Sequence, residues 1–202
     1  MCTIQGKLIE LGQIVSTSSG ATIQGGTFEI VGSNGLATTI ELTIMGIMIP
    51  VFGGLKLPAL LEVEFQVQGK FYKDEHVVNK VRVFNQQSLD AEPIAQTYVV
   101  EGKVLEVTPV KDGIDGTKRA FLKIARDGMT PAYNQCMVTV LDNLTEALSQ
   151  VKTGNNVQIC WKFDGNIFSK DGKQFISNKM IAVSVTKLSA KENLLKMDNS
   201  KI

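Results

Sequence analysis

Aromatic side chains stand next to lysines in three segments of the sequence, and this combination can do one kind of chemistry. An exposed aromatic ring can stack on a nucleobase, and a neighbouring ammonium group can neutralise a phosphate. The segments are "KFYKDEH" (70–76), "NIFSKDGK" (166–173) and "GTKRAF" (116–121). A structural interpretation competes with this one, because hairpin ends commonly carry aromatic residues beside solvated lysines.

The sequence offers no comparable case for catalysis or metal binding. Its single histidine, His76, lacks the cysteine or carboxylate partners that a metal site or a nucleophile–base pair needs. Cys2, Cys136 and Cys160 form no CxxC pair, so neither a disulfide framework nor a zinc knuckle is expected. No Walker loop is present. We therefore predict no catalytic residue, no metal site and no cofactor, and a reducing, cytoplasmic location.

The elements that must position the aromatic residues come in two copies. "IQGKLIEL" (4–11) and "VEGKVLEV" (100–107) share their pattern, "VEFQVQG" ends 96 residues before "ICWKFDG", and "NKVRV" begins 99 residues before "NKMIAV". A three-residue loop insertion accounts for the difference. The chain is therefore predicted to hold two modules of about 95 residues, each of ordinary small-domain size. They are expected at 1–95 and 96–188, with a flexible C-terminal tail at 189–202.

Hydrophobic periodicity in the second copy predicts five strands and one short helix. The strands are expected at 102–110, 120–125, 136–141, 156–163 and 175–188, and the helix at 142–151. The first copy repeats this order, with a degraded helix in "FGGLKLPALL". Five strands with a helix between the third and the fourth is the order of the OB-fold. We therefore predict a mainly β protein of two tandem five-stranded OB-fold-like barrels. A five-stranded SH3-like barrel is the competitor, and it usually lacks that helix.

The segment "LTIMGIMIPVFGGLKLPALL" (42–61) is apolar enough to suggest a membrane span. It contains Pro50, Gly53, Gly54, Lys56 and Pro58, which would break a spanning helix. We expect a buried strand followed by a tight connection, and no membrane partner.

Two tandem modules that open with "GK(V/L)xE(V/L)" and close with "NKxxxV" resemble OB-fold single-stranded DNA-binding proteins, particularly the small replication-associated kinds of bacteria and phages. The resemblance covers about residues 1–188. It implies a non-enzymatic protein that binds single-stranded DNA in replication, recombination or repair, inside a bacterial or phage-infected cell. The family often carries an acidic C-terminal tip that docks partner proteins, whereas the tail here is mixed in charge. A homo-oligomer or a replication protein is a further expected partner.

OB-folds bind ligands on the face of strands two and three and with neighbouring loops. Phe28 and Ile30 are expected to face the core of the first copy, and we match them to Leu122 and Ile124 in the second. Phe121 and Lys123 then face outward. Met137 and Thr139 share that outer face if Val138 and Val140 face inward. A register shift of one residue would instead place Phe121 in the core.

The remaining candidates extend this surface. Trp161 is in phase with Val157, Ile159 and Phe163 and is expected in the core, so its neighbour Lys162 faces outward. Lys118 and Arg119, near the start of the second copy's second strand, are expected to touch phosphate. The hairpin loops at 70–76 and 166–173 add aromatic residues and lysines. The full set of predicted nucleic-acid-binding residues is Phe121, Lys123, Lys118, Arg119, Met137, Lys162, Phe168, Lys170, Lys173, Lys70, Phe71, Tyr72 and Lys73.

The net charge of +1 hides a difference between the copies. Residues 1–95 carry six basic and nine acidic residues, and residues 96–188 carry twelve basic and nine acidic residues. A phosphate backbone is therefore expected to prefer the second copy. Two alternatives stay open: a structural or adaptor protein that binds other proteins, and RNA binding by the same surface.

Overall fold

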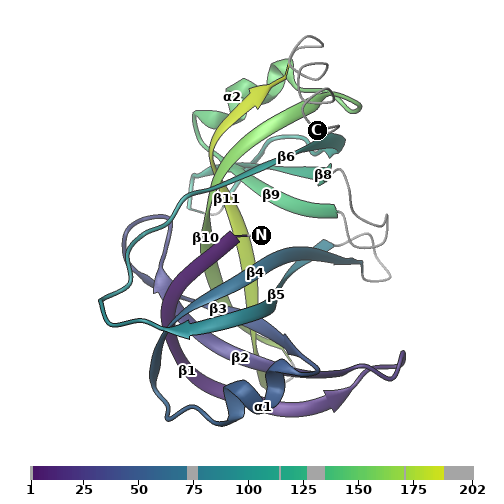
Figure 1. The fold of residues 1–202 in the computed structure, drawn as a ribbon. Coiled ribbons are helices and arrows are strands. Elements are labelled where there is room, and N and C mark those ends of the chain that lie inside the picture. The colour runs from purple at the N-terminus through teal and green to yellow at the C-terminus, as the bar shows by residue number, and fades with distance from the viewer. Residues whose placement is uncertain (1, 72–76, 114, 127–134, 171, 189–202) are drawn as a thin grey trace, which may run out of the picture. The chain divides into compact units, whose positions relative to one another are not determined.

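The computed structural model describes residues 2–71, 77–113, 115–126, 135–170 and 172–188. The predicted tail at 189–202 lies outside this part of the chain. Contacts divide the chain into two compact units, and each is built from two segments (Figure 1). Unit 1 comprises Met1–Tyr98 and Lys162–Met180, and unit 2 comprises Val99–Trp161 and Ile181–Ile202. The module boundaries at 95 and 96 remain a prediction.

Unit 1 contains a five-stranded mixed barrel in the predicted order of elements. Its strands and helix are β1 (Cys2–Ser16), β2 (Thr22–Val31), β3 (Ala37–Met45), α1 (Met48–Gly53), β4 (Ala59–Phe71) and β5 (Val77–Ser88). The strands are paired in the order β5-β3-β2-β1-β4, and a further pairing of β5 with β4 completes the circuit. Only the β3–β5 pairing among these is parallel. Alternate residues fill the core, and Phe28 and Ile30 face inward as predicted.

Unit 2 follows the same order of elements with one extra two-residue strand. Its elements are β6 (Tyr98–Val107), β7 (Lys111–Asp112), β8 (Lys118–Ala125), β9 (Gln135–Leu141), α2 (Leu144–Ala147), a 3-10 turn (Leu148–Gln150), and parts of β10 (Asn156–Lys170) and β11 (Lys173–Lys187). The strands are neighbours in the order β10-β6-β8-β9-β11. Trp161 is 3% exposed, which confirms the predicted core position.

The repeated glycine near the start of each copy has a steric cause. A Cβ on Gly6 would lie 2.5 Å from the backbone oxygen of Glu29, and a Cβ on Gly102 would lie 2.3 Å from that of Ala125. Each distance is shorter than a carbon–oxygen contact allows, so only glycine lets the first strand approach the second this closely. Both first strands also have a register irregularity soon after this glycine, beyond Leu8 and beyond Val104.

Part of the β10–β11 hairpin, Lys162–Met180, belongs to unit 1, and we call this segment the arm. At its base Gly165 accepts and donates hydrogen bonds with the Thr38 hydroxyl, at 3.4 and 3.1 Å. Asn178 uses its side-chain amide on the backbone of β3: it accepts from the Glu41 N–H at 2.7 Å and donates to the Glu41 carbonyl at 2.8 Å. Asn178 also lies opposite Asn79 of β5. The recurring "NK" motif therefore marks a strand pairing in unit 1.

The apolar segment at 42–61 forms the end of β3, the short helix α1 and the start of β4. The helix therefore begins earlier than the predicted "FGGLKLPALL". Within the described residues, no helix has both the length and the apolar composition that crossing a membrane requires.

Candidate nucleic-acid interface

The side chains of β8 and β9 face the sides that the sequence predicts. Leu122, Ile124, Val138 and Val140 are fully buried, whereas Phe121 is 38% exposed. Phe121 is therefore outside the core, and the alternative register is wrong. Lys123 and Met137 are half-buried on the same side. The binding role of these residues stays a prediction.

Cross-strand pairing brings the outward residues of β8 and β9 together. Phe121 lies opposite Thr139, and Lys123 lies opposite Met137, so the side chains in each pair are neighbours. Thr139 is 8% exposed, which leaves little of it for a ligand. We call these four residues the copy-2 face. It offers a ring, an ammonium group and a thioether within two adjacent cross-strand pairs.

Thr108 holds the backbone of Phe121 in place. The Phe121 N–H donates to the Thr108 hydroxyl at 2.8 Å, and the Thr108 N–H donates to the Phe121 carbonyl at 3.0 Å. Two bonds from one residue restrict the strand at the point where the aromatic ring projects. A ring on a restricted backbone loses less conformational freedom when a base stacks on it.

The two cations at the start of β8 differ in availability. Lys118 is exposed. Arg119 is half-buried, and its guanidinium forms an ion pair with Asp115. A hydrogen bond from the Thr117 backbone, with a smaller effect from Arg119, lowers the pKa of Asp115. Asp115 is therefore charged at neutral pH, and it competes with any phosphate for Arg119.

Phe168 lies on the arm and is 42% exposed. Its ring stacks on Phe175, which is 43% exposed, with centroids 5.7 Å apart and planes 23° apart. Sequence reasoning missed Phe175, although its position across a predicted hairpin from Phe168 was a usable signal. Lys162 is half-buried on the same arm. Because the arm belongs to unit 1, these residues and the copy-2 face lie in different units.

The remaining predicted residues lie beyond what the structure describes. The strands β4, β10 and β11 include the backbones of Lys70, Phe71, Lys170 and Lys173, but their side chains are outside the described part. Tyr72, Lys73 and the sole histidine, His76, are outside it entirely. In the part that is described, no cluster of histidine, cysteine and carboxylate side chains could hold a metal ion.

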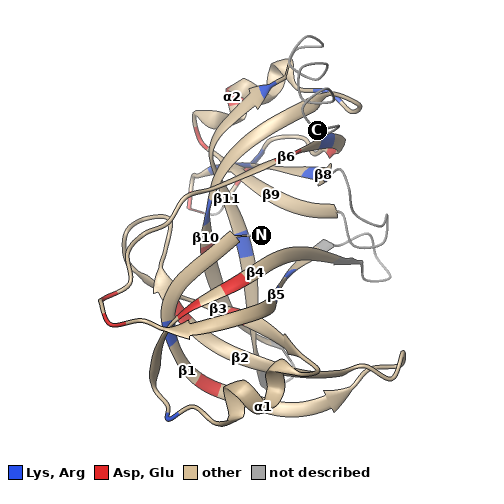
Figure 2. Cartoon of the chain, viewed as in Figure 1, with Lys and Arg blue, Asp and Glu red and all other residues tan. Residues whose placement is uncertain are grey.

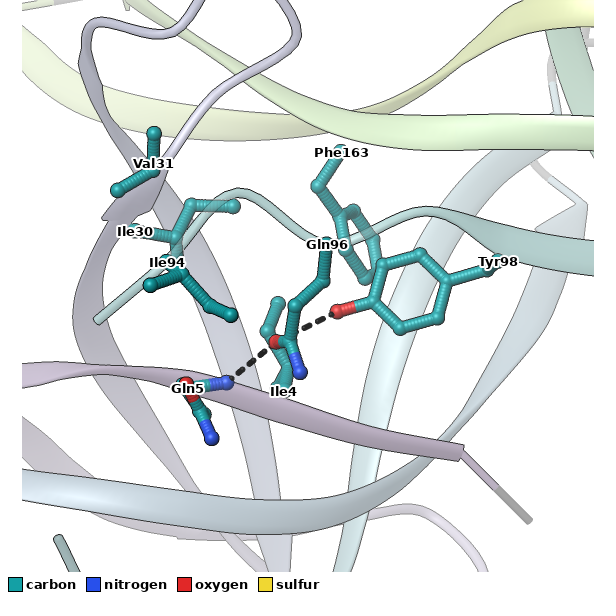
Figure 3. Close-up of a pocket in the computed structure, with 8 residues that line it drawn as sticks. All are labelled: Ile4, Gln5, Ile30, Val31, Ile94, Gln96, Tyr98 and Phe163. Atoms are coloured by element: carbon teal, nitrogen blue, oxygen red, sulfur yellow. Dashed lines mark hydrogen bonds between the residues drawn. The ribbon is translucent and has the colours of Figure 1, made fainter.

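A small pocket in unit 1 has a different chemical character (Figure 3). Its lining is Ile4, Gln5, Ile30, Val31, Ile94, Gln96, Tyr98 and Phe163. The Gln96 side-chain oxygen accepts from the Gln5 backbone N–H at 2.7 Å and from the Tyr98 hydroxyl at 3.2 Å. Burial raises the pKa of Tyr98, so the hydroxyl stays a donor. The lining contains no cation, so the pocket does not suit a phosphate.

No protein-family model and no curated protein sequence matches the chain. Among solved structures, the single-stranded DNA-binding protein from Thermus aquaticus matches with a TM-score of 0.66. The match covers 93% of this chain and 91% of that one at 13% identity.

The chain shares the fold of this DNA-binding protein. A deletion mutant of the same Thermus protein matches with a TM-score of 0.67 over 93% of both chains, at 14% identity. The resemblance to single-stranded DNA-binding proteins is therefore confirmed at the level of fold. At these identities the likeness shows the fold alone.

Proposed function

We propose that the chain is a non-enzymatic single-stranded DNA-binding protein of two tandem OB modules, acting in DNA replication, recombination or repair. The observation that carries the proposal is the copy-2 face: Phe121 projects from the second strand of a module, beside Lys123 and opposite β9. This is the strand pair on which OB-folds bind oligonucleotides. The fold shared with the Thermus aquaticus single-stranded DNA-binding protein supports it.

Binding would combine stacking and charge. A base stacks on the Phe121 ring, Lys123 neutralises a neighbouring phosphate, and Lys118, which is exposed at the start of β8, adds a further positive charge. Every base has a π-face, so this arrangement gives affinity with little sequence preference. The stacked pair of Phe168 and Phe175 on the arm adds an aromatic contact for a longer strand and is not a second independent site.

The test is fluorescence anisotropy with a labelled dT oligonucleotide of about 30 nucleotides, long enough for two OB sites. Phe121→Ala should weaken binding roughly 5- to 150-fold, since one base–aromatic stack is worth about 1–3 kcal/mol. Lys123→Ala should flatten the slope of log affinity against log salt by about 0.7, the value for one phosphate contact on a single strand. Val99→Ala removes an exposed apolar side chain elsewhere in unit 2 and is the matched control.

The same titration decides between the alternatives. A wild-type protein that fails to bind at low salt would contradict the proposal and favour an adaptor protein. Equal loss of affinity in the Val99 and Phe121 variants would contradict the assigned face. Competition between DNA and RNA of one sequence identifies the nucleic acid, because the 2′-hydroxyl is the group that differs.

A further inference from the structure

The strand registers allow the two copies to be compared residue by residue. Leu8 lies opposite Phe28, and Val104 lies opposite Ile124. Phe28 in turn lies opposite Ile40, and Ile124 lies opposite Cys136. One shift of 96 residues therefore relates both strand pairs. The structural equivalent of Phe28 is Ile124, so the sequence-based match to Leu122 is wrong by two residues, although the side that each residue faces is unchanged.

This shift identifies the first copy's counterpart of the copy-2 face. Phe121, Lys123, Met137 and Thr139 correspond in order to Gly25, Thr27, Glu41 and Thr43, and we call the latter four the copy-1 face. The pairings correspond as well: Gly25 lies opposite Thr43 and Thr27 opposite Glu41. The copy-1 face therefore has glycine where the aromatic ring stands, threonine in place of the lysine, and a carboxylate in place of the thioether.

The carboxylate lies close to the position of the missing ring. A Cβ on Gly25 would lie 3.6 Å from an oxygen of the Glu41 side chain, which is its nearest neighbour. A base placed there would bring its phosphate toward Glu41, and like charges at short range repel. Glu29, two residues beyond Thr27 on β2, adds a second acidic group on this side of the strand.

The charge of Lys80, which contacts Glu41, is already engaged. Lys80 of β5 forms an ion pair with Glu41 at 2.5 Å, and both side chains are about one-third exposed. Figure 2 shows further acidic segments on β1 and β4 of unit 1. Because Lys80 is paired with Glu41, its positive charge is already neutralised and attracts a phosphate less strongly.

We propose that the chain has one single-strand-binding face, on the second copy, and that Gly25 and Glu41 keep single-stranded nucleic acid off the equivalent face of the first copy. This inference rests on the proposed function. In the first copy the same strand pair serves as structure: the arm is hydrogen-bonded to Thr38 and Glu41 of β3. The strand register is thus the same in both copies. The aromatic ring and the lysine that we propose bind nucleic acid are present only in the second copy.

The experiment counts short oligonucleotides per full-length chain. A dT oligonucleotide of about 8 nucleotides, within the range for one OB site, is titrated by calorimetry and checked by native mass spectrometry. The wild type should bind one oligonucleotide per chain. The variant Gly25→Phe/Thr27→Lys/Glu41→Met transplants the second copy's groups and should bind two. The variant Glu41→Gln removes only the charge and keeps the glycine at position 25. It should still bind one oligonucleotide per chain, and any weak binding of a second should be stronger at low salt.

The reciprocal variant Phe121→Ala/Lys123→Thr should bind none. Two equal sites on the wild type would overturn the inference while leaving the proposed function intact, and absence of binding to any chain would overturn the proposed function itself. A transplanted variant that melts with the wild type and still binds one oligonucleotide would show that Gly25 and Glu41 are not the determinants. If the reciprocal variant keeps its site, the face has been assigned to the wrong copy.

Discussion

Gly165 at the base of the arm is the position where a single methyl group should have the largest effect on unit 1. In Gly165→Ala, the new Cβ would lie 1.7 Å from the backbone oxygen of Thr39 and 2.6 Å from its carbon. The neighbouring atoms belong to the backbone of β3, so no side-chain rotation relieves the overlap. The arm and β3 must move apart by more than an ångström.

The expected loss of stability follows from two contributions. Inserting a carbon into a closely packed contact typically costs about 1–3 kcal/mol. Separation also breaks the hydrogen bonds between Gly165 and the Thr38 hydroxyl, each with a net value of about 0.5–1.5 kcal/mol. We therefore expect a loss of about 3 kcal/mol. For unit 1, which holds about 117 residues, an unfolding entropy of about 2.1 cal/mol/K per residue makes this a fall in Tm of about 12 °C.

Differential scanning calorimetry measures this change, and tryptophan fluorescence locates it. The single tryptophan, Trp161, is buried in unit 2, so a loss confined to unit 1 should appear in the heat-capacity trace before the fluorescence changes. Gly12→Ala is the matched control, because its Cβ would meet nothing closer than 3.6 Å. A Gly165→Ala protein that melts within a degree or two of the Gly12→Ala protein would refute the packing argument.

Three further predictions concern other parts of the chain. Asn178→Ala removes both bonds to the Glu41 backbone and should lower stability by about 2 kcal/mol in urea denaturation; an unchanged midpoint would contradict the role of the amide. Burial raises the pKa of Cys136 to about 12 from 9.0; because the unfolded thiol ionises first, stability from this group is present below pH 9 and lost as pH rises toward 12. Cys136→Ala should therefore show a shallower decline in urea midpoint across that range, and parallel curves would contradict this. Phe168→Ala should weaken oligonucleotide binding more than a conservative Phe168→Tyr, and equal affinities would remove the ring pair with Phe175 from the interface.

Much of the secondary structure could be predicted from the sequence because each strand keeps its period of two. Leu122 and Ile124 recur at every second position, as do Trp161 and Phe163, so their burial follows from phase alone. The outward position of Phe121 followed from the same argument. Alternation determines which side of the strand a residue faces. It does not determine which residue of one copy corresponds to which residue of the other. The match of Phe28 to Leu122 was therefore wrong by an even number of residues, and only the strand register corrected it.

Contacts between distant segments lay beyond sequence reasoning. Nothing in the local pattern of Gly165 or Asn178 indicates that they meet β3, which is more than a hundred residues earlier in the chain. Phe175 is a different case: the predicted hairpin already placed it across from Phe168, but the pairing of the two rings was not worked out from the sequence. The association of Lys162–Met180 with unit 1 likewise depends on tertiary contacts, whereas the repeat alone assigns these residues to the second copy.

The three-residue insertion in the repeat acquires a physical meaning from these contacts. The first copy has nine residues between Gly69 and Asn79, which lie opposite one another in the β4–β5 pair. The second copy has twelve between Gly165 and Asn178, and both of these residues are hydrogen-bonded to β3. The extra residues therefore lie between these two anchors along the chain, in the part of the arm that carries Phe168 and Phe175. An anchored base and a longer tip present the two rings to solvent at little entropic cost, because the backbone beneath them is already ordered.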